Sequence, residues 1–411
     1  MITLNTKKLT EINPSHGLSN EELASNNHLI EDYLEKIHQR EQGFYKIIDD
    51  QDPIEKIEKF AQEVEGKYQD IVVLGIGGSS LGTICLQQSL THLYKKPNLH
   101  VLDNIDPIMI KEIQDVIDLE KTLFIVVSKS GNTPEILSQY SYFREIAKNF
   151  VFITGPKTGI LREIAEKEGI PTFDIPVNVG GRFSVLTPVG LLPAALIGMD
   201  IKKLIEGAQS MRDQFLDKNA EKNLPFQVAN VQFQLSQKGK IMNVLIPYAQ
   251  KLIRLADWYR QLLAESIGKR LNNQNEEIFS GITPINALGV TDQHSQSQLY
   301  NEGPNDKLLM FLHVDDFGAD IEIPDTPEVE YLKNVTFKKL IHTEMQGTIQ
   351  SLTQNHRPNF TIKTDKVCEF TLGELFMLFE GATAFLGEFL NINAFDQPGV
   401  ELSKNLTKEM L

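Results

Sequence analysis

The sequence contains little cysteine, no long hydrophobic run and fewer basic than acidic residues. Among its 411 residues are two cysteines, Cys85 and Cys368, which lie far apart in apolar surroundings. This number and spacing exclude a disulfide framework and a structural metal site, so we expect both thiols to be reduced and buried. No stretch of about 18 apolar residues occurs, which predicts a protein without a membrane-spanning helix.

The charge composition narrows the class of partner. The chain has 55 Asp and Glu against 40 Lys and Arg, a formal net charge of −15. Proteins that bind nucleic acid present a basic face, so this balance argues against a nucleic-acid partner. The first residues lack the apolar core of a secretory signal. We therefore expect a soluble, cytoplasmic α/β protein, and on composition alone an enzyme.

The pattern of apolar residues predicts strands and helices that alternate along the chain. Continuous apolar runs are typical of buried parallel strands, and apolar residues every three to four positions are typical of helices. The strands are expected at 70–78, 99–104, the start of 122–133, 151–155, 240–248 and 307–314. The helices are expected at 29–39, 53–64, 79–95, 106–117, 134–150, 159–169, 187–216, 251–271 and 369–392.

This alternation predicts parallel sheets whose strands are joined by right-handed crossovers. The pattern restarts after a long helical region, so we predict an α/β fold with two domains, at 67–205 and 206–411. The second domain is expected to end in a helical region. Residues 1–66 are polar and charge-rich, and we expect them to form helices that pack on the outside of the core.

The stretch VVLGIGGSSLG at 72–82 runs from a strand into a glycine and serine loop that three kinds of site could use. A dinucleotide site needs a third glycine where the sequence has Ser80. A serine hydrolase could use Ser80 within the weak pattern G-x-S-x-G. A phosphate site would use backbone N–H groups and the hydroxyls of Ser79 and Ser80 at the helix start. A plain tight turn explains the loop about as well as all of these together.

A second loop of the same kind favours the phosphate site. SKSGNT at 128–133 also follows a buried strand, and Thr133 and Pro134 suit the N-cap and first position of a helix. The loop supplies the hydroxyls of Ser128, Ser130 and Thr133. Because the carboxyl ends of parallel strands meet at one edge, we expect the two loops to lie close together. The chain lacks G-x-x-x-x-G-K-[ST], so a phosphorylated small metabolite is a better ligand than a P-loop nucleotide.

Longer motifs resemble one family. NVGGRFSVLTPVG at 178–190 and GEFLNINAFDQPGVELSK at 387–404 resemble the two fingerprints of the glucose-6-phosphate isomerase (phosphoglucose isomerase) family. LLAESIGKR at 262–270 and TDQHSQSQLY at 291–300 resemble its two catalytic segments. The resemblance runs in order from about residue 70 to 405 and is to the short bacterial form. Ile267 differs from the Asn of many members, and Ser80 differs from the Asp of many animal forms, but neither residue is assigned chemistry.

The resemblance implies two sugar isomerase domains of flavodoxin-like type, with parallel sheets flanked by helices. It implies an aldose–ketose isomerase that interconverts glucose 6-phosphate and fructose 6-phosphate in glycolysis and gluconeogenesis. The sugar ring opens, and a proton moves between C2 and C1 through an enediol-type intermediate. No cofactor or metal is implied. The partners implied are the phosphosugar and a second copy of the chain, in a homodimer that shares its active sites.

This reaction needs a base and a group that stabilises an oxyanion. Glu265, near a helix end among apolar residues, is the expected base, although such a residue is elsewhere usually solvated. Arg182 follows two glycines and is expected to stabilise the enediolate. The resemblance assigns ring opening to His294, which reaches the neighbouring subunit's site, with help from Lys404. The expected substrate and phosphate contacts are Gly77, Gly78, Ser79, Ser128, Ser130, Thr133 and Gln397.

Two other classes of function stay open. A phosphosugar-sensing module on the same fold would bind ligand without turnover, and is usually joined to a DNA-binding domain that we do not recognise here. A serine hydrolase using Ser80 would be labelled by a fluorophosphonate. An isomerase that also accepts mannose 6-phosphate is a nearer alternative, which the residues beside the base would decide.

Overall fold

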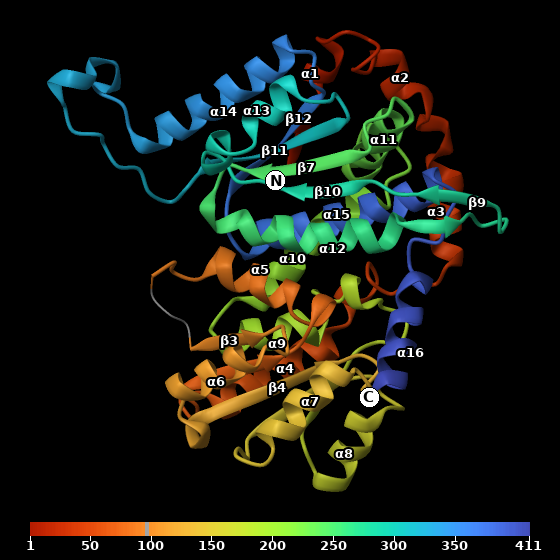
Figure 1. Ribbon diagram of the computed structural model, residues 1–411, viewed down its shortest axis with the longest axis vertical. Helices are drawn as coiled ribbons and strands as arrows, with labels where there is room; N and C mark the ends of the chain where they lie inside the picture. The colour runs from red at the N-terminus through yellow and green to blue at the C-terminus, as the bar shows by residue number, and fades with distance from the viewer. Residues whose placement is uncertain (95–97) are drawn as a thin grey trace. The chain divides into compact units, whose positions relative to one another are not determined.

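The computed structural model describes residues 1–94 and 98–411, and these form two compact units (Figure 1). We call Arg40–Arg212 with Cys368–Met377 the serine-loop unit. We call Met1–Gln39, Asp213–Val367 and Leu378–Leu411 together the Glu265 unit. The domain limits 1–66, 67–205 and 206–411 stay a prediction. Lys95, the last residue of the predicted helix 79–95, lies outside the described residues.

The serine-loop unit is built on a five-stranded parallel sheet in the order β3-β2-β4-β5-β6. By position in the chain this order is 2-1-3-4-5, the flavodoxin-like order, so the fold class expected from the sequence is confirmed. The strands are β2 (Asp70–Leu74), β3 (Leu99–Leu102), β4 (Thr122–Ser128), β5 (Phe150–Thr154) and β6 (Thr172–Asp174). The helices are α4 (Gln51–Val64), α5 (Leu81–Leu90), α6 (Pro107–Val116), α7 (Pro134–Phe143), α8 (Ile160–Glu168), α9 (Pro188–Leu196) and α10 (Ile201–Phe215), the last of which continues into the Glu265 unit.

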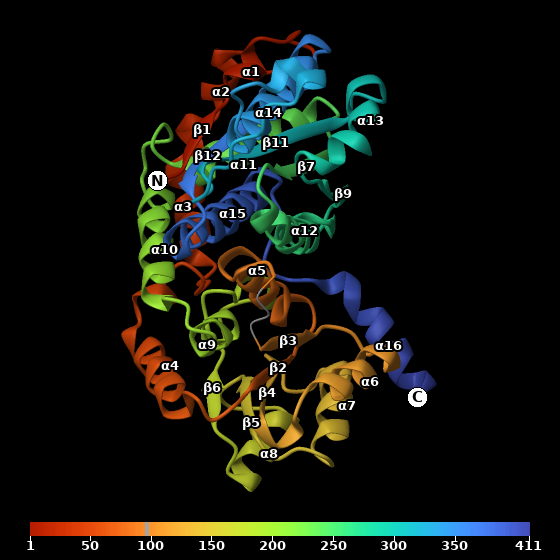
Figure 2. The same cartoon turned by 90° about the vertical axis from the view of Figure 1, so that its left-hand side faces the viewer.

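Apolar residues on alternate strand positions build the core of this unit. Phe124, Val126 and Phe152 are fully buried and belong to one cluster with residues of α6, α7 and α8. The ring of Tyr140 on α7 meets Phe152 edge to face, with centroids 5.0 Å apart. Helices α4 and α9 lie side by side (Figures 1 and 2). Helices therefore flank a sheet whose central strand β4 is buried along its whole length, as the continuous apolar run predicted.

The Glu265 unit also has a five-stranded sheet, in the order β1-β12-β11-β7-β10. Its strands β7 (Met242–Pro247), β10 (Thr283–Asn286), β11 (Lys307–Asp316) and β12 (Asn359–Lys366) are parallel, and β1 (Thr3–Asn5) joins them antiparallel. The helices are α1 (Lys7–Thr10), α2 (Asn20–Ser25), α3 (Ile30–Gln39), α11 (Leu224–Gln237), α12 (Ile253–Ile267), α13 (Ser297–Glu302), α14 (Phe337–Gln354), α15 (Glu369–Phe389) and α16 (Glu401–Met410). The part of α15 up to Met377 belongs to the serine-loop unit. A hairpin of β8 (Lys269–Leu271) and β9 (Glu277–Ser280) follows α12.

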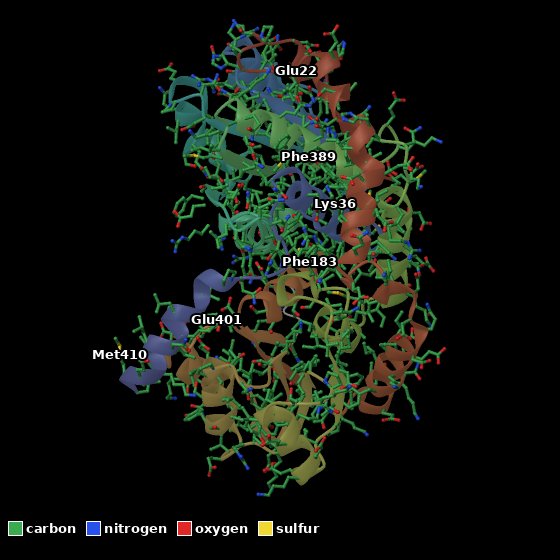
Figure 3. The ribbon with its side chains drawn as sticks, turned by 90° about the vertical axis from the view of Figure 1, so that its right-hand side faces the viewer. Glu22, Lys36, Phe183, Phe389, Glu401 and Met410 are labelled. Atoms are coloured by element: carbon green, nitrogen blue, oxygen red, sulfur yellow. The ribbon has the colours of Figure 1, made fainter. Side chains whose placement is uncertain are left out.

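Helix α15 is long and apolar enough to cross a membrane by length and composition, but 94% of its most apolar window is buried inside the protein. That degree of burial is typical of a core helix. Near its end lies Phe389, which Figure 3 labels. Its ring meets Tyr33 of α3 edge to face with centroids 4.9 Å apart, and stacks on Phe233 of α11 at 5.0 Å. These contacts tie the N-terminal segment to the core of the Glu265 unit.

Several predicted elements differ from the observed ones. The helix predicted at 251–271 ends at Ile267, because Gly268 leaves helical geometry and Lys269 begins a strand. The region at 187–216 divides into two helices around Gly198, whose φ of +83° is left-handed. Cys85 is buried as expected, whereas Cys368 is only partly buried, so the prediction of two buried thiols is wrong for the second.

Candidate active site

The two glycine and serine loops lie at the same edge of one sheet. Strands β2 and β4 are neighbours, with Leu74 paired to Val126. The loop at 75–80 follows β2 and leads into α5, and the loop at 129–133 follows β4 and leads into α7. This edge is the carboxyl end of the sheet, at the point where the strand order reverses. The expected proximity of the two loops is therefore confirmed.

The hydroxyl groups of the second loop gather in one cluster. Ser128 Oγ lies 2.7 Å from Thr133 Oγ1 and 3.5 Å from Ser130 Oγ, which accepts a hydrogen bond from the Asn132 amide at 3.1 Å. Thr133 is the N-cap of α7, and Pro134 occupies the first turn, as predicted. The exposure rises from buried Ser128 to exposed Ser130. The cluster therefore opens toward solvent beside the first turn of a helix, where an anion is stabilised.

The glycine loop packs directly against the segment that carries Arg182. A Cβ added to Gly78 would lie 2.3 Å from the carbonyl oxygen of Gly181, so only glycine allows this approach. Ser184 Oγ donates a hydrogen bond to the same Gly181 oxygen at 2.6 Å. Arg182 is 4% exposed, and its guanidinium carbon lies 5.6 Å from the centre of the Phe183 ring. Arg182 is thus a buried cation beside the glycine loop, rather than a surface arginine.

The two serines of the glycine loop differ in their surroundings. Ser80 is 1% exposed, and its hydroxyl donates to the Gly77 carbonyl oxygen at 3.1 Å. A hydroxyl that is buried and bonded to its own loop is a poor candidate for a hydrolase nucleophile. Ser79 is half-buried in the short helical turn Gly77–Ser79. Ser79 therefore remains the better candidate for a phosphate contact.

Sequence reasoning did not select Lys129, which lies between Ser128 and Ser130 in the second loop. Its side chain is half-buried, and Nζ donates to the Val177 carbonyl oxygen at 2.9 Å. Burial lowers the pKa of this lysine from its usual value. In the sequence, Lys129 stands between two serines at the end of a predicted strand. That position could have identified it as a second cation of the serine-loop unit, in addition to Arg182.

In the Glu265 unit, Glu265 lies in the last turn of α12. Its side chain is half-buried beside the fully buried Leu262 and Ile267. Gln261, one turn earlier, donates from Nε2 to Glu265 Oε2 at 3.2 Å. The carboxylate is therefore partly removed from water and accepts a hydrogen bond from an amide.

Gln397 lies near the start of the short helical turn Pro398–Val400 and is exposed. The residue before it, Asp396, is joined to the end of α12 through Lys269. Lys269 Nζ donates to the carbonyl oxygen of Asp396 at 2.6 Å and to that of Glu265 at 2.9 Å. The structure therefore brings the segments of Glu265 and Gln397 together within one unit.

His294 is at the other end of the same unit. Its neighbour Gln293 donates to the Tyr248 hydroxyl at 2.7 Å, and Tyr248 follows the carboxyl end of β7. Helix α12 begins at this end, and Glu265 is twelve residues beyond Ile253, a rise of about 18 Å. Figure 1 shows α13, which follows His294, and the hairpin that follows Glu265 at opposite ends of α12. His294 is exposed, and the structure does not bring it to Glu265 of the same chain.

Lys404 lies on α16, whose ten residues are all exposed. Its Nζ is 2.9 Å from Oε1 of Glu401, one turn earlier. Figure 3 labels Glu401 and Met410 at the two ends of this helix. The structure therefore gives Lys404 a solvent-exposed position and does not place it against Glu265 or Gln397 within the unit.

Comparisons with known proteins agree on one family. The model of the phosphoglucose isomerase family matches residues 51–314 and 332–411. The glucose-6-phosphate isomerase of Carboxydothermus hydrogenoformans is 45% identical over 400 residues, covering 92% of this chain and 86% of that protein. That of Rubrobacter xylanophilus is 35% identical over 428 residues, covering 99% and 97%.

Solved structures extend this similarity to the fold. The crystal structure of a hypothetical protein from Thermus thermophilus matches with a TM-score of 0.91 and 33% identity, covering 100% of this chain and 99% of that chain. A glucose-6-phosphate isomerase from Chlamydia trachomatis shares the fold, with a TM-score of 0.83 at 22% identity over 96% of this chain and 87% of that one. With a family model and close relatives spanning most of its length, the chain belongs to the phosphoglucose isomerase family.

Proposed function

We propose that this chain is an isomerase that interconverts glucose 6-phosphate and fructose 6-phosphate, in glycolysis and gluconeogenesis. The observation that carries the proposal is the pair of glycine and serine loops at adjacent strand ends, with buried Arg182 packed against one of them. Many hydroxyl donors and a fixed cation suit a phosphorylated substrate whose reaction develops negative charge. The family membership supports the same activity.

The phosphate group is assigned to the serine-loop unit. The hydroxyls of Ser79, Ser128, Ser130 and Thr133 would donate to its oxygens, and the backbone at Gly77 and Gly78 allows a close approach. Lys129 is half-buried between Ser128 and Ser130 in the chain, and its Nζ donates to the Val177 carbonyl oxygen. Arg182 would stabilise the enediolate oxygen, because a buried guanidinium acts more strongly there than one in water.

Glu265 is assigned the proton transfer. As a carboxylate it removes the proton from C2 of the open aldose, and the electron pair moves to the carbonyl oxygen to form the enediolate. A proton passes from the C2 hydroxyl to the C1 oxygen, and returning the abstracted proton to C1 then gives the ketose, so no group is consumed and no cofactor is needed. Its half-buried position and the hydrogen bond from Gln261 favour one orientation of the carboxylate. Gln397 and Lys404 are assigned contacts with the sugar oxygens.

Ring opening is assigned to His294 of a second copy of the chain, in a homodimer. The protein is assigned to the cytoplasm. The separation of His294 from Glu265 along the length of α12 supports this assignment, because one chain would leave the two groups apart. An imidazole can both accept and donate a proton, which suits acid–base work on the ring oxygen and the neighbouring hydroxyl.

The first test is a coupled assay. The purified protein is mixed with fructose 6-phosphate in a chelator, and glucose 6-phosphate is detected by its dehydrogenase. Rapid turnover is expected. Phosphosugar binding without turnover would contradict the proposed isomerase and favour a sensing module.

The shared site is tested by complementation. Glu265→Gln and His294→Gln should each be inactive alone, because each removes a group needed at every site. Mixed and allowed to exchange subunits, they should recover about a quarter of the wild-type activity, since half of the dimers are mixed and each has one intact site. The control is a Glu265→Gln/His294→Gln double variant mixed with wild type. The double variant supplies neither group, so a mixed dimer of these two chains has no intact site. Active single variants, or no recovery after proven exchange, would contradict the assignment.

A further inference from the structure

Lys269 is a buried lysine that joins two segments of the Glu265 unit. Its side chain is 5% exposed, on the first residue of β8, just after α12. Nζ donates to the carbonyl oxygens of Glu265 at 2.9 Å and Asp396 at 2.6 Å, and lies 3.3 Å from the Asp396 carboxylate. One ammonium group thus bonds to backbone atoms of two residues that are 131 positions apart.

These contacts match the needs of a buried ammonium group. Lysine has three N–H donors, and an ammonium group removed from water is destabilised unless they are satisfied. Here two carbonyl oxygens and a carboxylate oxygen lie within reach. The carbonyl of Glu265 also belongs to the last turn of α12, whose orphan carbonyls favour a cation. The lysine therefore holds the end of this helix and the loop before Gln397 at a fixed separation.

We propose that Lys269 is a positioning residue for the isomerase reaction, fixing the Glu265 backbone against Asp396 and so aligning the Glu265 carboxylate with Gln397. The proposal rests on the function proposed above. Lys269 acts through the backbone, because its ammonium group bonds to the backbone carbonyl oxygen of Glu265. A displacement of the base by about 1 Å can reduce the rate about 100-fold, so this link matters for turnover.

The neighbouring residue provides a matched control. Arg270 is also basic and lies on the same strand, but its side chain is 70% exposed and pairs with Glu277 across the hairpin. Successive strand residues point to opposite faces, which explains why one cation is buried and the next is solvated. Replacing Arg270 by Met removes a charge of the same sign without touching the Glu265–Asp396 link.

The test compares Lys269→Met, Lys269→Arg and Arg270→Met in the full chain. We expect Lys269→Met to lower kcat about 100-fold, to change KM for fructose 6-phosphate less than threefold, and to leave inhibition by inorganic phosphate unchanged. The pH values at the two limbs of its kcat profile should stay in place, because no titrating catalytic group is removed. Lys269→Arg should recover part of the rate, since it keeps the charge beside Asp396, and Arg270→Met should match wild type.

Each outcome decides the proposal. A folded Lys269→Met with kcat within threefold of wild type would overturn it, as would a loss expressed in KM alone. If Lys269→Met does not fold, Lys269→Arg decides: a reduced kcat at unchanged KM supports positioning, and wild-type kcat overturns it. An inactive wild-type protein would instead overturn the proposed function, so the two failures are distinguished by the wild-type assay.

Discussion

Substituting Gly78 by Ala tests whether the contact between the glycine loop and the Arg182 segment is required. The added Cβ would lie 2.3 Å from the Gly181 oxygen, 2.4 Å from its carbon and 2.8 Å from the Arg182 amide nitrogen. All three are backbone atoms, which cannot rotate away as a side chain would. Ordinary contact begins at 3.4 Å, so the two segments must separate by about 1 Å.

This separation should reduce both stability and activity. Overpacking of this kind destabilises a protein by about 1–3 kcal/mol, which urea unfolding measures as a lower midpoint at an unchanged slope. A shift of about 1 Å between the glycine loop and Arg182 should lower kcat/KM about 100-fold in the coupled assay.

A neighbouring glycine provides the stability control. Apart from Gly181 and its two neighbours in the chain, no atom of the described residues lies within 4 Å of a Cβ built on Gly181. Gly181→Ala should therefore unfold at the wild-type urea midpoint or slightly above it, because alanine restricts the unfolded chain. A Gly78→Ala protein as stable and active as wild type, or an equal loss of stability in both variants, would refute the steric argument.

Two further predictions concern hydroxyl groups and a buried acid. Ser128→Ala removes a hydroxyl bonded to Thr133 and should raise KM for the phosphosugar. Ser80→Ala should leave turnover intact, because the Ser80 hydroxyl bonds within its own loop. Fluorophosphonate labelling of the wild type that disappears in Ser80→Ala would instead support a hydrolase. Burial raises the pKa of Glu380 well above its ordinary 4.5, so the folded protein keeps this proton to a higher pH than the unfolded chain. The contribution of Glu380 to the free energy of unfolding should therefore fall with rising pH above 4.5, by about 1.4 kcal/mol per pH unit, until the folded carboxyl titrates. In urea unfolding, the stability of Glu380→Gln relative to wild type should increase over that pH range and should not increase near pH 4. A stability difference between the two proteins that does not change with pH would contradict the raised pKa of Glu380.

The elements that hold the serine loops were predictable because they are local. Strand β4 is a run of seven consecutive buried residues, and Thr133 and Pro134 mark the start of α7 without reference to any distant residue. Parallel pairing then places the loops after β2 and β4 at one edge. The contact between Gly78 and Gly181 was not predictable in the same way, because it joins residues that are 103 positions apart.

The missed elements carry weaker patterns. Strand β12 (Asn359–Lys366) contains two Lys and an Asp and is exposed at its end, so it lacks the continuous apolar run used to predict buried strands. Helix α14 buries only Met345, Ile349 and Leu352 of its eighteen residues, which leaves a narrow apolar face. The helix predicted at 251–271 was too long because helical spacing continues through Gly268, while the chain turns there into β8.

The sequence does not reveal that Lys269 is a buried, positioning lysine. In the sequence, Lys269 and Arg270 are adjacent basic residues, and two adjacent cations are usually both solvated. The turn at Gly268 converts a predicted helix position into a strand position, where alternation buries the first cation and exposes the second. The acceptors that stabilise the buried charge then come partly from Asp396, far along the chain, and only the folded unit brings them together. If the base of this reaction needs such a link, the ESIGK segment at 265–269 contributes two residues with different tasks, one that transfers the proton and one that fixes its backbone.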